Sequence, residues 1–127
     1  MVANKDEFKK ALLSARDKKV FLNTKYLDML KAQYSSKNHT ITATQLAESV
    51  GYKNFNTSNL QYGTFGHAIA DELGYIPPKR KDGTAMWYLT LSESAGNEDE
   101  VDEQYEFMMR KELVEALEEL KWVRKLS

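Results

Sequence analysis

The chain has no cysteine among its 127 residues. This excludes a disulfide scaffold, a zinc site with thiolate ligands and a cysteine nucleophile. No apolar run approaches the length of a membrane span, and the first ten residues lack the apolar core of a secretory signal. A chain without cysteine is compatible with a reducing compartment, so we expect a cytoplasmic protein.

Familiar catalytic motifs are missing as well. The sequence contains no His-Glu-x-x-His, no Walker loop and no Gly-x-Ser-x-Gly. Its two histidines, His39 and His67, lie in different expected elements and have no obvious carboxylate partner. An isolated histidine of this kind is more often structural or exposed than catalytic. We therefore expect no enzyme, no cofactor and no metal site.

The composition suits one small globular domain. Apolar residues make up 42 %, and seven Tyr, five Phe and two Trp favour a real core. The net charge of −1 hides an asymmetry: residues 1–91 carry thirteen Lys/Arg and eight Asp/Glu, whereas residues 92–127 carry five and eleven. A basic body with an acidic tail indicates a charged partner, although chance clustering of charges on solvated faces explains it equally well.

Two helices are expected before the centre of the chain. Residues 4–16 have apolar positions at helical spacing, with acids first and bases last, as the helix dipole favours. Residues 20–22 form either a strand fragment or simply core. The second helix begins at Asn23 or Thr24, each of which can cap its first turn, and it ends in the polar turn 35–38.

Residues 42–74 predict a helix-turn-helix. Thr42 and Gln45 form a capping box, and Gly51 supplies the left-handed stop of a short first helix after an extended piece at 39–41. Residues 59–73 form the second helix, which ends at Gly74. Its buried stripe consists of Tyr62, Phe65, Ile69 and Leu73. Gly63 and Gly66 weaken this helix by about 1 kcal/mol each but would let another backbone approach closely.

A basic hairpin follows the second helix. Residues 79–83 carry three cations and an Asp-Gly turn signal. Residues 86–91 (MWYLTL) alternate in the manner of a strand, with Trp87, Leu89 and Leu91 on one face. Residues 92–104 are acidic and read as a linker. Residues 105–109 suggest a strand, and a helix beginning at Arg110 or Lys111 runs through Leu120.

These elements predict an α+β protein with a winged helix-turn-helix core, an N-terminal helix and a C-terminal strand-helix extension. We expect three segments: residues 1–91 as the winged-helix domain with its N-terminal helix, residues 92–104 as the acidic linker and residues 105–127 as the extension.

The function expected of this arrangement is double-stranded DNA binding, as a regulator or a targeting module. A helix-turn-helix lays its second helix in the major groove, where amide, hydroxyl and imidazole groups contact base edges and phosphates. The hairpin cations would add salt-sensitive backbone contacts. The candidate DNA contacts are Lys53 in the turn, Asn56 and Asn59 at the helix start, Gln61, Thr64 and His67 on the helix, and Lys79, Arg80 and Lys81 on the hairpin.

A protein–protein interaction module without nucleic-acid binding is the alternative. Residues 62–73 carry no Lys or Arg, and they include Asp71 and Glu72. Three cations at a hairpin tip also keep a sheet edge soluble. The acidic C-terminal region could bind a basic partner, or fold over the protein's own basic face.

The segments ITATQLAESVGY, NLQYGTFGHAIADELGY and MWYLTL resemble the winged helix-turn-helix domains of bacterial and phage proteins. The run NLQYG, the late tryptophan and the sequence YEFMMRKELVEALEELKWV are similar to an uncharacterised bacterial group, some members of which occur beside or fused to HNH nuclease domains. This resemblance implies nucleic-acid association in a mobile-element or restriction setting. The chain has no HNH motif, so any nuclease activity would belong to a partner.

Overall fold

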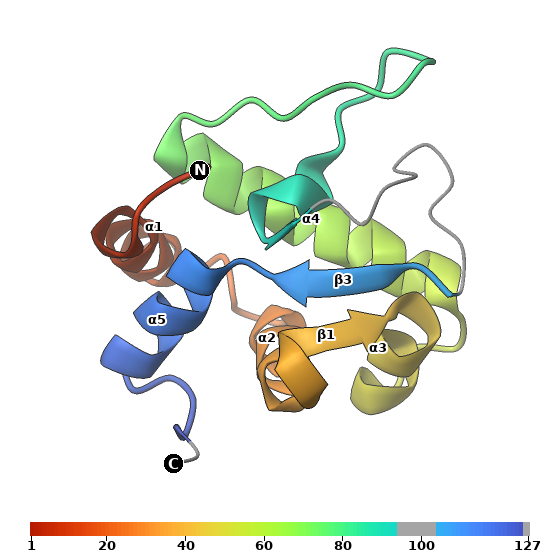
Figure 1. Ribbon diagram of the computed structural model, residues 1–127, viewed down its shortest axis with the longest axis horizontal. Helices are drawn as coiled ribbons and strands as arrows, with labels where there is room; N and C mark the ends of the chain where they lie inside the picture. The colour runs from red at the N-terminus through yellow and green to blue at the C-terminus, as the bar shows by residue number, and fades with distance from the viewer. Residues whose placement is uncertain (94–103, 126–127) are drawn as a thin grey trace.

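A computed structural model describes residues 1–93 and 104–125. Within these ranges the protein is a mixed α+β structure with five α-helices and one small sheet, which confirms the expected class at this level (Figure 1). The elements are, in order, α1 Lys5–Asp17, α2 Tyr26–Ser35, η1 Lys37–His39, β1 Thr40–Thr42, α3 Ala43–Val50, α4 Phe55–Leu73, η2 Trp87–Thr90, β2 Ser92–Glu93, β3 Glu106–Met109 and α5 Lys111–Glu119.

The sheet is antiparallel, with the strand order β1-β3-β2. β3 is therefore its central strand, and Phe107 pairs with Ile41 on one side while Met109 pairs with Ser92 on the other. Phe107 and Met109 point into the core, whereas the alternate residues of β3 are exposed. The expected strand at 105–109 is thus confirmed, and its partners are β1 and β2.

The expected strand at 86–91 is wrong. Residues 87–90 form the 3-10 helix η2, in which the Leu89 amide donates to the Met86 carbonyl at 3.1 Å and the Leu91 amide to the Tyr88 carbonyl at 3.1 Å. Residues 88–91 are all buried. Because the segment is covered on both sides, its alternating sequence carries no information about which residues face the core.

The first two residues of the predicted linker are part of the sheet. Ser92 and Glu93 form β2, and the Ser92 side chain is fully buried. Residues 94–103, the rest of the linker apart from Gln104, lie outside the described part of the chain. The division into three segments therefore stays a prediction, but β3 and α5 share one core with the preceding elements.

The helix-turn-helix pair has the expected caps. Thr42 accepts from the Gln45 amide at 3.1 Å, while the Gln45 side chain accepts from the Thr42 amide at 3.0 Å. Gly51 ends α3 with a φ of 80°, in the left-handed region. α4 begins four residues earlier than expected, at Phe55, because Asn54 caps it by accepting from the Thr57 amide at 3.0 Å. Asn59 consequently lies inside the helix rather than at its start.

The N-terminal helices are as expected, with shifted boundaries. α1 covers the helix expected at 4–16, and α2 starts at Tyr26 rather than at Asn23 or Thr24. Residues 20–22 form turns and no strand. Phe21 is part of the core there, since its ring makes an edge contact with Phe65 at a centroid distance of 5.4 Å.

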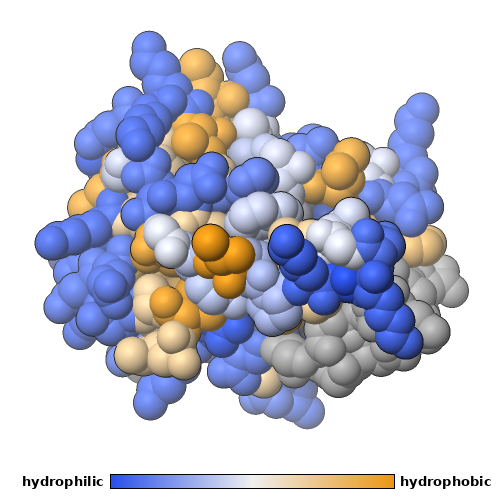
Figure 2. Space-filling view, turned by 90° about the horizontal axis from the view of Figure 1, so that it is seen from above, coloured by the Kyte–Doolittle hydropathy of each residue, from blue (hydrophilic) through white to orange (hydrophobic). Residues whose placement is uncertain are grey.

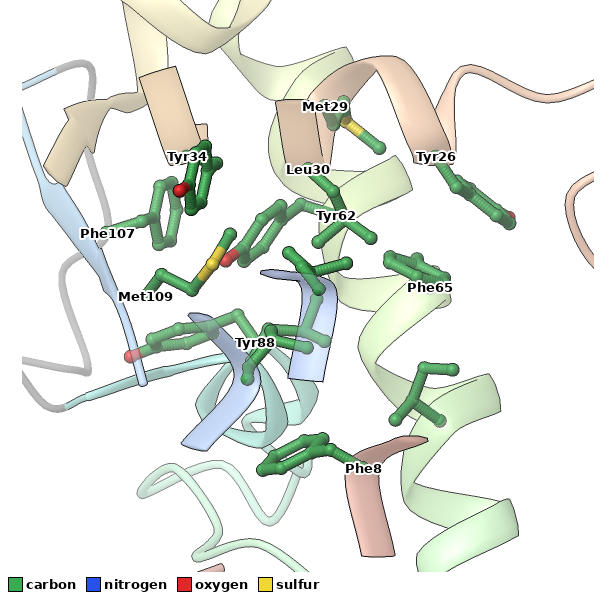
Figure 3. Close-up of a cluster of buried hydrophobic side chains, with 14 of the residues drawn as sticks. Phe8, Tyr26, Met29, Leu30, Tyr34, Tyr62, Phe65, Tyr88, Phe107 and Met109 are labelled. Atoms are coloured by element: carbon green, nitrogen blue, oxygen red, sulfur yellow. The ribbon is translucent and has the colours of Figure 1, made fainter. Parts of the chain in front are cut away.

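A buried polar cluster ties the helices to the sheet. Tyr62 of α4 donates to the Gln33 side-chain oxygen of α2 at 2.8 Å and also contacts the Ser92 hydroxyl of β2. The Gln33 amide group donates to the Phe107 carbonyl of β3 at 3.0 Å. Burial raises the pKa of Tyr62 far above its ordinary value. Figure 3 shows Tyr62 and Phe107 facing each other in this part of the core.

α1 and α5 pack against each other although they lie at opposite ends of the chain (Figure 1). Phe8 and Leu12 of α1 are fully buried, as are Leu113 and Leu117 of α5. The C-terminal helix is therefore part of the core and not a separate extension. None of the described helices combines the length and the apolar character needed to cross a bilayer.

Candidate nucleic-acid interface

One face of α4 is open to solvent. Asn56, Leu60, Thr64, His67 and Asp71 are all exposed, and their spacing of three or four residues places them on a single stripe. The stripe exists because the opposite face of the helix is committed to the core. Its polar side chains are amide, hydroxyl, imidazole and carboxylate groups, which can donate to or accept from a ligand.

The hairpin at 79–83 projects away from the body of the protein, at the top of Figure 1. Lys79 and Ala85 form an antiparallel bridge, and the Arg80 amide donates to the Thr84 carbonyl at 2.7 Å. Gly83 adopts a φ of 90°, a backbone conformation that suits glycine. The predicted turn is therefore confirmed.

Asp82 stabilises the hairpin from inside. One of its carboxylate oxygens accepts from both the amide and the hydroxyl of Thr84, at 2.9 Å and 2.6 Å. These hydrogen bonds hold the pKa of Asp82 below its usual value. The carboxylate is thus part of the turn, and the neighbouring cations are presented on a defined loop.

A groove of about 450 Å³ lies between the exposed stripe of α4 and the hairpin. We call it the α4 groove, and its lining residues are Asn56, Asn59, Leu60, Gly63, Thr64, His67, Arg80, Ala85, Trp87, Tyr88 and Phe107. Figure 2 views the protein from the hairpin side, where hydrophilic residues cover most of the surface and hydrophobic residues form separate patches. The lining residues come from α4, the hairpin, η2 and β3, so the groove lies between segments that are distant in sequence.

Five of the nine candidate DNA contacts line this groove: Asn56, Asn59, Thr64, His67 and Arg80. The other four do not. Lys53 is exposed in the turn before α4, Lys79 and Lys81 are exposed on the hairpin, and Gln61 is half-buried on another side of the helix.

His67 lies flat against Trp87. Their ring centroids are 3.7 Å apart and the ring planes differ by 5°. The His67 Nε2 atom is also 3.5 Å from a carboxylate oxygen of Asp71, one helical turn further on. The expectation that His67 has no carboxylate partner is therefore wrong, and the spacing of four residues between His67 and Asp71 on one helix was the sequence signal for this pair.

Asn59 and Thr64 differ in how well their polar groups are satisfied. The Thr64 hydroxyl donates to the Leu60 carbonyl at 2.8 Å, within the helix. The Asn59 side-chain oxygen is buried, and no described residue donates a hydrogen bond to it. A buried acceptor without a donor is unfavourable by about 1–3 kcal/mol. The Asn59 oxygen is therefore an unpaired buried acceptor within the described structure.

Gly66 determines where Trp87 sits. A Cβ atom at Gly66 would lie 2.3 Å from the Trp87 carbonyl oxygen, so only glycine allows η2 to pack at this distance from α4. The close backbone approach expected at the two glycines is thus found at Gly66. At Gly63 a Cβ atom would meet nothing within 4 Å, since it would project into open space.

The aromatic part of the groove is absent from the candidates that the sequence suggested. Trp87 was expected on one face of a strand, and Tyr88 on the other. Phe107 comes from β3, 34 residues after Leu73, the last residue of α4. Only the tertiary fold brings these three rings beside Asn59. In the sequence, the two glycines of α4 predicted that another backbone segment packs closely on this helix, and Gly66 is the one at which it does.

The described residues contain no group of three or more His, Cys, Asp or Glu side chains that could hold a metal ion. The described lining of the groove offers the guanidinium of Arg80, the side-chain amides of Asn56 and Asn59, and aromatic rings. The chain matches no protein-family model, no curated protein and no solved structure.

Proposed function

We propose that the protein is a winged helix-turn-helix that binds double-stranded DNA through α4 and the basic hairpin. The element order supports this proposal: a helix, a strand, two capped helices and a pair of antiparallel strands, with the sheet order β1-β3-β2. α3 and α4 are joined by a short turn after Gly51, as in a helix-turn-helix. α4 is then the recognition helix.

The hairpin at residues 79–83, which we expected to serve as the wing, lies between α4 and η2 and is separate from the connection between β2 and β3. That connection includes residues 94–103, whose sequence carries five acidic residues and no basic one. The cations lie instead on the separate hairpin between α4 and η2. Phosphate contacts are therefore assigned to residues 79–81 and not to the connection between β2 and β3.

The observation that carries the proposal is that the exposed stripe of α4 and the hairpin border one groove. Side chains suited to base edges, such as Asn56 and His67, lie on the same side of the protein as the cation Arg80. The exposed Leu60 could contact a thymine methyl group. Phosphate contacts then provide affinity and fix the register on the duplex, and the helix contacts base edges.

Titration with a random-sequence duplex at several salt concentrations tests the proposal. The double variant Lys79→Ala/Lys81→Ala removes two hairpin cations but keeps Arg80, whose guanidinium donates to Thr84 and the Ala85 carbonyl within the hairpin. Each lost phosphate contact should reduce the slope of log K against log salt by about 0.9. We expect weaker binding and a slope that is smaller by nearly two.

The matched control is Lys10→Ala/Lys37→Ala. It changes the net charge by the same amount at exposed lysines on α1 and after α2. Its affinity should fall much less than that of the hairpin variant. If the wild-type protein shows no salt-dependent binding, or if both double variants lose the same affinity, the assignment of the DNA contact to this face is wrong.

A protein partner is the second candidate function, and Leu60 favours it. Its side chain is 66 % exposed in the middle of the stripe on α4, where it would be covered in a protein interface. Leu60→Ser separates the two functions. It should leave generic duplex binding almost unchanged, because most of that affinity is electrostatic, but should weaken an interface that buries this leucine.

A further inference from the structure

Two adjoining hollows lie at the end of the protein opposite the basic hairpin. One, of about 360 Å³, lies between the ends of α1 and α5 and the first turns of α2, and the other, of about 340 Å³, lies between the last turn of α2 and the residues after α5. Lys31 and Trp122 line both, and we call the two hollows together the Trp122 surface. In Figure 1 the chain after α5 is at the bottom, whereas the hairpin is at the top.

The apolar side chains of the Trp122 surface can be reached from solvent. Phe21 and Leu27 line one hollow and Val123 lines the other, and all three are half-buried, as is Trp122. The Trp122 ring makes an edge contact with Phe21, with centroids 5.4 Å apart, which fixes its position. A partly exposed tryptophan beside a hollow is typical of the residues that contribute most to binding in protein interfaces.

Cations border these apolar side chains. Lys31, Lys121 and Arg124 are exposed, and none of them forms an ion pair or a side-chain hydrogen bond with a described residue. A fourth lining cation, Arg16, is paired with Asp17 at 3.2 Å. The described lining of the two hollows includes no acidic residue. The surface therefore favours a partner that carries negative charge.

The helices α1 and α5 end beside this surface with lysine in a position that usually holds glycine. Lys121 has a φ of 61°, in the left-handed region. Its amide donates to the Glu118 carbonyl at 3.1 Å, and the Trp122 amide donates to the Leu117 carbonyl at 3.1 Å, as in a Schellman motif. Lys19, with a φ of 64°, occupies the same position after α1, whereas α3 and α4 end at glycine.

A lysine at position 121 has a cost in stability, because side-chain-bearing residues are strained in the left-handed region. The helix dipole favours a cation near this end, but a lysine elsewhere in the last turn would provide the charge without the strain. The strained position places the Lys121 side chain at the hollow that Trp122 lines. We conclude that its charge serves binding.

We propose that the Trp122 surface docks an acidic peptide segment of a partner protein. Apolar side chains of the peptide enter the two hollows beside Trp122, and its carboxylates contact the ammonium groups of Lys31 and Lys121. A peptide supplies both kinds of group. A nucleic acid fits less well, because the described lining offers aliphatic side chains and no Asn, Gln or His for base edges. This docking is independent of the proposed DNA binding, which uses the opposite side of the protein.

NMR titration of the ¹⁵N-labelled protein tests the docking. The probe is the peptide Glu-Glu-Leu-Asp-Glu-Phe-Glu-Glu with blocked ends. The indole N–H signals of the two tryptophans report on different places, Trp122 on this surface and Trp87 on the α4 groove. We expect a saturable shift at Trp122 and none at Trp87. A peptide with serine in place of leucine and phenylalanine should bind about tenfold more weakly.

Three results of this titration would overturn the proposal. The first is the absence of a shift at Trp122 with the probe peptide. The second is equal affinity for the serine peptide, since the contact would then be one of charge alone. The third is a shift of the Trp122 signal by oligothymidylate as strong as that by the peptide, since the surface would then bind nucleic acid.

The variant Lys121→Gly separates binding from stability. Glycine relieves the left-handed backbone, so the Tm of the variant should equal or exceed that of the wild type. Its affinity for the probe peptide should nevertheless fall about threefold, and that of Lys31→Ala/Lys121→Gly about tenfold. The matched control is Lys79→Ala/Lys81→Ala, which removes two cations from the hairpin and should bind the peptide as the wild type does. Wild-type peptide affinity in Lys31→Ala/Lys121→Gly would refute the docking.

Duplex titration of the same variants keeps the two proposals apart. Lys31→Ala/Lys121→Gly should bind a random duplex nearly as the wild type does, because both lysines lie away from the hairpin. A protein that binds the duplex but not the peptide overturns only the docking. A protein that binds the peptide but not the duplex overturns only the proposed DNA binding.

Discussion

The packing of η2 against α4 leads to opposite expectations for two glycines three residues apart. Both Gly63 and Gly66 lie inside α4, so replacing either by alanine gains up to about 1 kcal/mol of helix propensity. At Gly63 the new methyl group would meet nothing within 4 Å. We therefore expect Gly63→Ala to raise the free energy of unfolding by about 0.5–1 kcal/mol.

At Gly66 the methyl group would collide with backbone. The Trp87 carbonyl oxygen lies 2.3 Å from the Cβ position, and it must retreat by about 0.7 Å to reach the 3.0 Å limit of real contacts. η2 cannot move freely, because Tyr88 and Leu89 are buried in the core. Overpacking of this kind costs about 1–3 kcal/mol or more. The net expectation for Gly66→Ala is a loss of about 2 kcal/mol.

Urea and thermal denaturation, followed by circular dichroism, measure both variants. For a domain of this size, 1 kcal/mol corresponds to about 4 °C in Tm, so Gly66→Ala should melt about 8 °C below the wild type and Gly63→Ala slightly above it. The dependence of the unfolding free energy on urea should stay the same, since neither change alters the area exposed on unfolding. Equal stabilities of the two variants would show that η2 does not pack on α4 at this distance.

Three further expectations concern stability. Thr42→Ala removes the capping box of α3 and should cost about 1 kcal/mol in urea denaturation; no loss would mean that the cap is not formed. Tyr62→Phe leaves the Gln33 oxygen without its donor and should cost about 1–3 kcal/mol by the same assay. Burial and a hydrogen bond to Glu118 raise the pKa of Tyr34 from 10.0 to about 12. The unfolded tyrosine ionises first, so the unfolding free energy should fall between pH 10 and 12, and less steeply in Tyr34→Phe.

The sequence by itself determined which segments are helical and those helix ends that local caps and glycines set, but not the starts of α2 and α4. The Thr42–Gln45 cap, the glycine stops and the apolar stripe of α4 are local features, in which neighbours along the chain satisfy each other. The turn signal at 82–83 likewise specified the hairpin. Four of the candidate contacts that line the groove lie on α4, where helical phase separates an exposed face from a buried one, and the fifth, Arg80, lies on the hairpin.

Only the tertiary structure decided the form of residues 86–91 and the identity of the central strand. Residues 88–91 are buried on all sides between α4 and the sheet, so alternation could not separate a strand from a 3-10 helix. β3 lies between two strands that precede it in sequence, and such a pairing depends on long-range contacts. The aromatic wall beside Asn59 has the same origin, because Trp87 and Phe107 reach α4 only after Gly66 and the sheet have set their distances.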